Sequence, residues 1–154
     1  MLMTSLQDDI SDIELKQRWR LYWLQTIFEF ANINLQKMAW IQKENSDWPD
    51  KEAWESSFYE CTSAYFDILA LNDAYEKAVL WKNISKQEAE HAKKFHQLLV
   101  FYMEPSSDAS DILADQEWLE VVNAAKEFWL YLRKYITAKR ELELINELEN
   151  KYPF

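Results

Sequence analysis

The chain contains no glycine among its 154 residues. At average usage, about 7%, roughly 11 glycines would be expected. Glycine supplies the positive φ angle that tight turns, phosphate-binding loops and the common left-handed helix cap require. Its absence therefore disfavours short β-hairpins and excludes the glycine-rich nucleotide-binding motifs. This feature predicts an all-α chain of long helices joined by a few loops.

Length and composition predict a single helical domain over residues 1–154. Hydrophobic residues make up 49% of the chain, and eight Trp, eight Tyr and eight Phe supply a large apolar surface for a core. Cys61 is the single cysteine, so no internal disulfide can form. The start of the chain lacks the basic and apolar regions of a signal peptide, and the apolar run at 98–103 is far shorter than a membrane span. We expect a cytoplasmic protein that has no membrane segment.

Capping signals and apolar periodicity predict four helices, at about 11–45, 51–82, 85–103 and 111–150. Ser11 and Ser85 each precede a glutamate by three residues, which is the spacing of a capping box. Pro49 and Pro105 break the pattern between helices. Short links between amphipathic helices are typical of an up-down-up-down four-helix bundle. The third helix is too short to cover its neighbours, so a homodimer is possible.

The apolar stripes predict which residues face the core. Expected inward residues are Leu24, Ile27, Phe28, Ala31, Leu35 and Met38 in the first helix, Trp54, Phe58, Cys61, Tyr65, Ile68, Asn72, Tyr75 and Val79 in the second, Ala92, His96, Leu99 and Met103 in the third, and Trp118, Val122, Ala125, Trp129, Leu132, Ile136, Leu142, Ile145 and Leu148 in the fourth. Glu29, Asn32 and Gln36 are expected on the polar face of the first helix, which Trp40 interrupts. Asn72 is interpreted as a core polar residue or a kink, with a ligand contact as the alternative.

No catalytic motif is complete in this sequence. Glu88 and His91 form an E-x-x-H pair, which the ferritin-like di-iron proteins use twice, together with two further glutamates. The chain has two histidines, and Lys93 stands where His96 would need a glutamate. A ferritin-like metalloprotein remains an alternative, but Glu88 is interpreted as the acid of a capping box. We expect a protein that is not an enzyme and has no cofactor.

Charge is the feature that points to a partner. The net charge of −10 disfavours nucleic acid and anionic membranes and favours a basic protein. No lysine or arginine occurs between Phe95 and Ala125, and the connection between the first two helices is also rich in acids. In an up-down bundle these two connections lie at the same end. The pattern therefore predicts one negatively charged surface.

Tryptophans near these connections complete a candidate binding surface, because aromatic anchors are enriched in protein interfaces. The predicted partner-binding residues are Asp47, Trp48, Asp50, Trp54, Asp108, Asp111, Asp115, Glu117 and Trp118. In this hypothesis the acids occupy the place of substrate phosphates, while Trp48 and Trp118 anchor the contact. The alternative is an idle surface on which acids cap helix N-termini.

In class and composition the chain resembles bacterial immunity proteins that block nuclease toxins, and some phage-encoded nuclease inhibitors. That resemblance implies a protein that inhibits a basic partner by docking onto it. A second hypothesis is a small-molecule or cofactor binder that uses an aromatic pocket between the helices. Its expected lining residues are Trp19, Tyr22, Trp23, Trp81 and Tyr135. An oligomeric scaffold without a site is a further alternative.

Overall fold

The computed structural model describes residues 11–41, 54–72 and 74–154, and it contains helices and no strand within these ranges. The all-α prediction is therefore confirmed. The helices are α2 (Asp12–Ala31), α3 (Ile33–Gln36), the π-helix η1 (Lys37–Ile41), α4 (Phe58–Ser63), the π-helix η3 (Ala64–Ile68), α5 (Glu76–Leu80), α6 (Lys86–Phe101), α7 (Ala109–Ala114), α8 (Gln116–Tyr135) and α9 (Lys139–Lys151).

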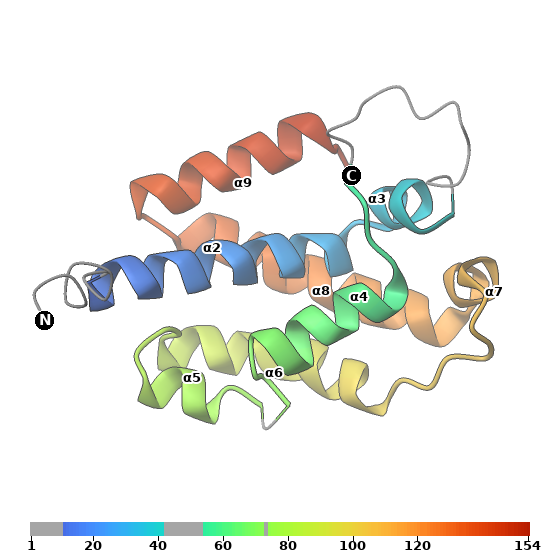
Figure 1. Ribbon diagram of the computed structural model, residues 1–154, viewed down its shortest axis with the longest axis horizontal. Helices are drawn as coiled ribbons and strands as arrows, with labels where there is room; N and C mark the ends of the chain where they lie inside the picture. Colours follow the sequence, from blue (N-terminus) through green and yellow to red (C-terminus); the bar gives the residue numbers. More distant parts are fainter. Residues whose placement is uncertain (1–10, 42–53, 73) are drawn as a thin grey trace, which may run out of the picture.

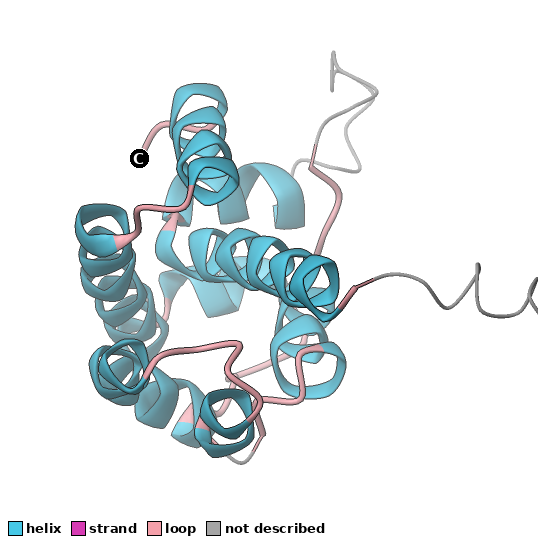
Figure 2. Cartoon of the chain, turned by 90° about the vertical axis from the view of Figure 1, so that its left-hand side faces the viewer, coloured by secondary structure: helices cyan, strands magenta, loops and turns pink. Residues whose placement is uncertain are grey.

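Successive segments run in alternating directions along the long axis (Figure 1). Helix α2 packs against α8, α9 and α4, while α6 packs against α8 and α5. Seen end-on, other helices surround α2 (Figure 2). The start of α4, the end of α6, α7 and the start of α8 gather at the right-hand end of Figure 1, and α5 and the end of α8 lie toward the opposite end.

The first predicted helix begins as expected but ends early. The Ser11 hydroxyl accepts a hydrogen bond from the Glu14 amide at 3.1 Å, and this caps α2. At Asn32 the backbone leaves the helical region, with φ −119° and ψ 95°. Its side chain accepts from the Leu35 amide and starts α3. The prediction of one helix over 11–45 was wrong because an asparagine side chain can replace the helical hydrogen bonds of the backbone.

The side chains that face the core differ from those that the apolar stripe predicts. Glu29, Gln36 and Trp40, predicted on the polar face, are 5%, 0% and 5% exposed, and Asn32 is buried too. Met38, predicted to point inward, is 36% exposed. The π-helix that follows α3 adds to the rotation, since its turn is wider than that of an α-helix.

The second predicted helix, 51–82, is interrupted twice within the described residues. Ser57 caps α4 by accepting from the Glu60 amide. The π-helix η3 then moves the apolar stripe by one residue, so that Leu69 is buried and Ile68 is 66% exposed. A turn follows in which Asn72 is exposed, so its interpretation as a core polar residue was wrong, and the predicted helix is interrupted at this point.

Residues other than glycine take the left-handed backbone conformation in this part of the chain. Ala70, Ala74 and Lys82 have φ angles of 57°, 61° and 64°. Such a conformation costs a residue with a Cβ atom about 1–2 kcal/mol. These turns therefore form without glycine. As a result, the backbone between α4 and α6 is strained at three residues.

The third predicted helix starts with the complete capping box of Ser85 and Glu88. It ends at Phe101, because the backbone of Tyr102 is extended with ψ 132°. Met103, which was predicted to face the core, is consequently 80% exposed.

The fourth predicted helix, 111–150, is three helices in the structure. Asp115 is extended, with ψ 126°, and its side chain caps α8 by accepting from the Glu117 amide. The chain leaves the helix again at Ile136, and α9 folds back along the molecule (Figure 1). Glu149 of α9 accepts hydrogen bonds from Trp129 and Arg133 of α8, which holds the two helices together. The predicted inward stripe of α8 is buried throughout, with Trp118, Trp129 and Leu132 at 0% exposure.

Candidate functional site

The predicted partner-binding acids that the structure describes lie at one end of the molecule. Asp108 and Asp115 are the N-caps of α7 and α8, Asp111 lies in α7, and Glu117 lies in the first turn of α8. Asp47, Trp48 and Asp50 lie outside the described residues. Capping explains the local role of Asp108 and Asp115, as the alternative interpretation expected.

Residues from separate parts of the chain meet at this end. The Tyr102 hydroxyl donates to the Asp115 carboxylate at 2.9 Å. Burial, that hydrogen bond and the charges of Asp115, Glu104 and Glu117 raise the pKa of Tyr102. Desolvation and the Glu104 carboxylate likewise raise the pKa of Tyr59, which stands at the start of α4. The start of α4 and the connection after α6 therefore share one negative electrostatic environment.

Large apolar side chains stand beside these acids. Phe101 and Met103 are 81% and 80% exposed, and Tyr59 is 48% exposed. We call this surface the acidic pole, which consists of Tyr59, Phe101, Met103, Glu104, Asp108, Asp111, Asp115 and Glu117. Helix η1, which carries the exposed Lys37, also packs against α7. The pole combines exposed apolar groups with an excess of negative charge.

The two described tryptophans of the predicted site do not face outward as anchors. Trp118 is fully buried and donates its indole N–H to Gln36 at 2.9 Å, so its predicted role as an anchor is wrong. Trp54 is partly buried, and its indole N–H donates a hydrogen bond to the Glu29 carboxylate at 3.0 Å. Burial of a large aromatic ring stabilises the fold because it removes apolar surface from water. At these two positions the rings are buried against the core. Phe101, Met103 and Tyr59 provide the exposed apolar area in their place.

Glu29 is a buried carboxylate that the sequence did not single out. It accepts the indole N–H of Trp40 at 2.8 Å and that of Trp54 at 3.0 Å. Burial raises the pKa of Glu29, and hydrogen bonds from Trp40, Ser56, Trp54 and Cys61 oppose that increase. Trp40 and Trp54 stand on either side of residues 42–53. One carboxylate thus ties together described residues from the two sides of 42–53.

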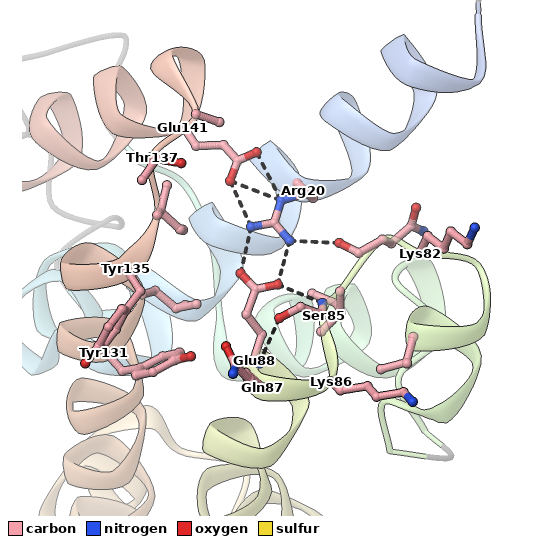
Figure 3. A pocket seen from close by; sticks show the side chains of 16 residues that line it. Arg20, Lys82, Ser85, Lys86, Gln87, Glu88, Tyr131, Tyr135, Thr137 and Glu141 are labelled. Atoms are coloured by element: carbon pink, nitrogen blue, oxygen red, sulfur yellow. Dashed lines mark hydrogen bonds and ion pairs between the residues drawn. The ribbon is translucent and has the colours of Figure 1, made fainter.

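A hollow of about 660 Å³ lies toward the opposite end, and Arg20 forms part of its lining (Figure 3). Arg20 donates to Glu141 and Glu88 at 2.8 Å each, and to the Asn83 carbonyl oxygen at 2.8 Å. Burial alone would lower the pKa of Arg20, but the two carboxylates outweigh it and raise that pKa. Because the guanidinium hydrogen bonds go to protein groups, Arg20 is engaged in holding α2, α6 and α9 together.

The hollows that the described residues form at Arg20, His96, Trp40 and Glu29 do not bring the five residues of the expected aromatic pocket together. Of its five predicted residues, Tyr135 alone lines the Arg20 hollow. Trp23 is fully buried, Trp81 is 52% exposed, and Tyr22 lines a separate hollow of about 200 Å³ beside Glu29.

Glu88 and His91 have structural partners. Both oxygens of Glu88 accept from Arg20, and one also accepts from the Ser85 amide. The His91 ring stacks on Tyr131 with 3.7 Å between ring centroids, and its Nδ1 is 2.9 Å from the Gln87 carbonyl oxygen. Across the described ranges, no three His, Cys, Asp or Glu side chains group in a way that could hold a metal ion.

No protein family model, curated protein or solved structure matches this chain. None of the helices in the described part of the chain has both the length and the apolar character that crossing a bilayer demands.

Proposed function

We propose that the chain is a non-enzymatic binding protein that docks its acidic pole onto a basic protein. The observation that carries this proposal is the exposure of Phe101 and Met103, at 81% and 80%, directly beside Glu104. Isolated exposed apolar residues are ordinary on protein surfaces. Two large exposed side chains within an acidic surface, however, offer a partner an apolar contact together with the long-range electrostatic field of the carboxylates. The absence of Lys and Arg from Phe95 to Ala125 leaves that field weakly compensated.

The charge of the pole indicates the chemistry of the partner. Carboxylates attract a surface rich in Lys and Arg and accelerate its association, and arginine side chains also stack on Tyr and Phe rings. Proteins that bind nucleic acid carry such basic surfaces. We therefore propose a nuclease or another nucleic-acid-binding protein as the partner, with the acids of the pole in place of phosphates. Inhibition follows if the acidic pole covers the partner's substrate site.

Site-specific photo-crosslinking in the cells that make the chain tests this proposal. A photoreactive phenylalanine analogue replaces Met103 in one variant and Ile13 in the control. Ile13 is similarly exposed, at 81%, but lies in the first turn of α2. We expect a basic protein to be captured from position 103 and not from position 13. Capture of no protein specific to position 103, or of an acidic one, would contradict the proposal.

A pair of charge variants then tests the role of the field. Glu104→Gln with Glu117→Gln removes two charges from the pole, and Glu143→Gln with Glu147→Gln removes two charges from α9. We expect the first pair to slow association with the captured partner by about tenfold at low salt. The effect should shrink at 0.15 M salt, where the Debye length is about 8 Å. Equal effects of the two pairs would refute a specific role for the pole.

A further inference from the structure

A hollow of about 360 Å³ lies at the acidic pole, beside Trp40. The end of η1, the start of α4 and residues 107–110, which include the start of α7, line it. The start of α4 and α7 lie at the same end of the molecule (Figure 1). The volume falls within the range of about 300–1,000 Å³ that is usual for binding pockets. Because Tyr59 and Asp108 of the acidic pole belong to the lining, the hollow is a candidate subsite of that surface.

Two aromatic rings form the floor of the hollow. Trp40 and Phe58 are 5% and 7% exposed, and their ring centroids lie 6.1 Å apart in an edge-to-face contact. Both rings also contact Trp118 in the core, with centroid distances of 5.8 Å and 5.3 Å. The Trp40 indole N–H donates to Glu29 at 2.8 Å, which fixes the orientation of that ring. The floor is thus held in place before a partner binds, and such pre-organisation lowers the entropic cost of binding.

The sides of the hollow are more exposed than its floor. Ile41 and Tyr59 are 40% and 48% exposed, so apolar surface of both side chains remains in contact with water. Three serines contribute polar groups to the lining, namely Ser57, Ser107 and Ser110. A long side chain with an apolar stem and a polar tip matches this combination of surfaces.

Asp108 supplies the charge at the rim of the hollow. One of its carboxylate oxygens accepts from the Ser110 amide at 2.9 Å, and the other has no hydrogen-bond partner among the described residues. The Glu104 carboxylate, which raises the pKa of Tyr59, adds negative charge on the same side. The described lining includes no lysine or arginine, although η1 carries Lys37 outside it. The hollow therefore offers a negative charge and a hydrogen-bond acceptor to a cation from another molecule.

These features favour the side chain of arginine over that of lysine. A guanidinium group is planar and weakly hydrated, so it can stack on an aromatic ring and donate hydrogen bonds to a carboxylate. Tyr59 provides an exposed ring, and Asp108 provides the carboxylate. The aliphatic stem of the arginine would cover Trp40 and Phe58. A lysine ammonium group is a strongly hydrated point charge and would gain less from the rings.

We propose that this hollow is an arginine subsite, which receives one arginine side chain of the basic partner, with the guanidinium bound to Asp108 and stacked on Tyr59. The inference rests on the proposed function, because it names the group by which the acidic pole recognises its partner. It also gives Asp108 a role in addition to the capping of α7. Phe101 and Met103 supply a separate apolar contact on the same pole.

Amide NMR of the full chain tests the subsite without the partner. Acetyl-arginine-amide, acetyl-citrulline-amide and acetyl-lysine-amide are titrated separately in about 0.15 M salt, where the Debye length is about 8 Å. We expect the arginine probe to shift the amide signals of Ile41, Tyr59 and Ser110 to saturation at millimolar concentration, as for a fragment of this size, and to leave those of α9 unchanged. Absence of saturation, or equal shifts throughout the chain, would overturn the subsite.

The other two probes separate the charge of the ligand from its shape. Citrulline has nearly the shape of arginine but no charge, so it should bind about two- to fivefold more weakly, which is the range for an exposed ionic contact. Lysine has the charge without the planar guanidinium group and should also bind more weakly than arginine. Equal binding of citrulline and arginine would overturn the role of the carboxylate. Equal binding of lysine and arginine would overturn the assignment to arginine.

A matched pair of variants locates the contact. Asparagine caps helices about as well as aspartate does, so Asp108→Asn should preserve the start of α7 while it removes the charge from the hollow. We expect this variant to bind the arginine probe about two- to fivefold more weakly and to lose the preference over citrulline. Asp115→Asn removes the same charge from the cap of α8, which does not line the hollow, and it should weaken binding less. Equal weakening would show a general effect of the acidic pole and refute the contact.

The outcomes separate this inference from the proposed function. Capture of a basic protein from position 103, together with no binding of the arginine probe, would overturn the subsite and leave the proposed function in place. Saturation by the arginine probe, together with no captured basic protein, would support the subsite and contradict the proposed function.

Discussion

Replacement of Arg20 by methionine should destabilise the protein far more than replacement of any exposed arginine. In the wild type the guanidinium lies between Glu88 and Glu141, whose side chains are 13% and 6% exposed. Methionine fills a similar volume but leaves two neighbouring carboxylates buried without a cation. Removing one partner from a buried ion pair costs about 3–5 kcal/mol. The lower bound corresponds to more than a hundredfold change in the unfolding equilibrium.

Urea unfolding followed by tryptophan fluorescence at pH 7 measures this loss. Arg140→Met is the matched control, because Arg140 is 53% exposed in its contact with Glu14 and should cost about 0–1 kcal/mol. Adding Glu88→Gln and Glu141→Gln to the Arg20 variant removes the uncompensated charges and should recover most of the stability. This triple variant keeps the test decisive if the single variant does not fold.

The loss should also depend on pH. Burial alone would raise the pKa of Glu88, but hydrogen bonds from Arg20 and Ser85 lower it overall. A carboxylate with a lowered folded-state pKa stabilises the fold above its unfolded pKa, near 4.5, and this contribution disappears as the pH falls through the folded-state pKa. The difference between wild type and variant should therefore be smaller at pH 4 than at pH 7. A loss below about 1 kcal/mol at pH 7, or one independent of pH, would refute this reasoning.

Four further variants test other parts of the fold. Glu29→Gln leaves one acceptor oxygen for two indole N–H groups, so the free energy of unfolding should fall by about 1–3 kcal/mol in urea at pH 7, and an unchanged value would contradict the role of the carboxylate. Ala74→Gly should stabilise by about 0.5 kcal/mol because relief of left-handed strain exceeds the entropy that glycine adds to the unfolded chain, whereas Ala89→Gly inside α6 should destabilise by about 1 kcal/mol. Because burial lowers the pKa of His96, the unfolded chain binds a proton first, so stability should decrease as the pH falls below about 6.5. His96→Gln should remove that part of the slope, and an identical slope would contradict it.

The helical class and the best-capped helix starts could be predicted because their causes are local. The hydroxyls of Ser11 and Ser85 cap the helices that follow them, as their spacing predicts. Ser57 and Glu60 have the same spacing, and this signal for the start of α4 was missed. The break at Asn32 also had a local sign, since asparagine favours caps over helix interiors.

Other features depend on contacts that periodicity does not encode. The π-turn of η3 exchanges Ile68 for Leu69 in the core, and nothing in the apolar pattern marks the inserted residue. The burial of Glu29 requires two tryptophans from different segments, so its charged side chain was assigned to the surface. The sequence pattern placed Trp118 both on an apolar stripe, which predicts a core residue, and in an acidic stretch, which predicts a surface anchor. In the structure Trp118 is a core residue with 0% exposure.

The left-handed residues Ala70, Ala74 and Lys82 all belong to the stretch between α4 and α6. Helix α8, by contrast, contributes Trp118, Trp129 and Leu132 to the fully buried core. Local opening begins where few contacts offset the conformational cost, so amide protons of this stretch should exchange with solvent well before those of α8. The molecule then has a built-in order of opening, in which the wall around His96 can loosen and re-form while the main core stays closed.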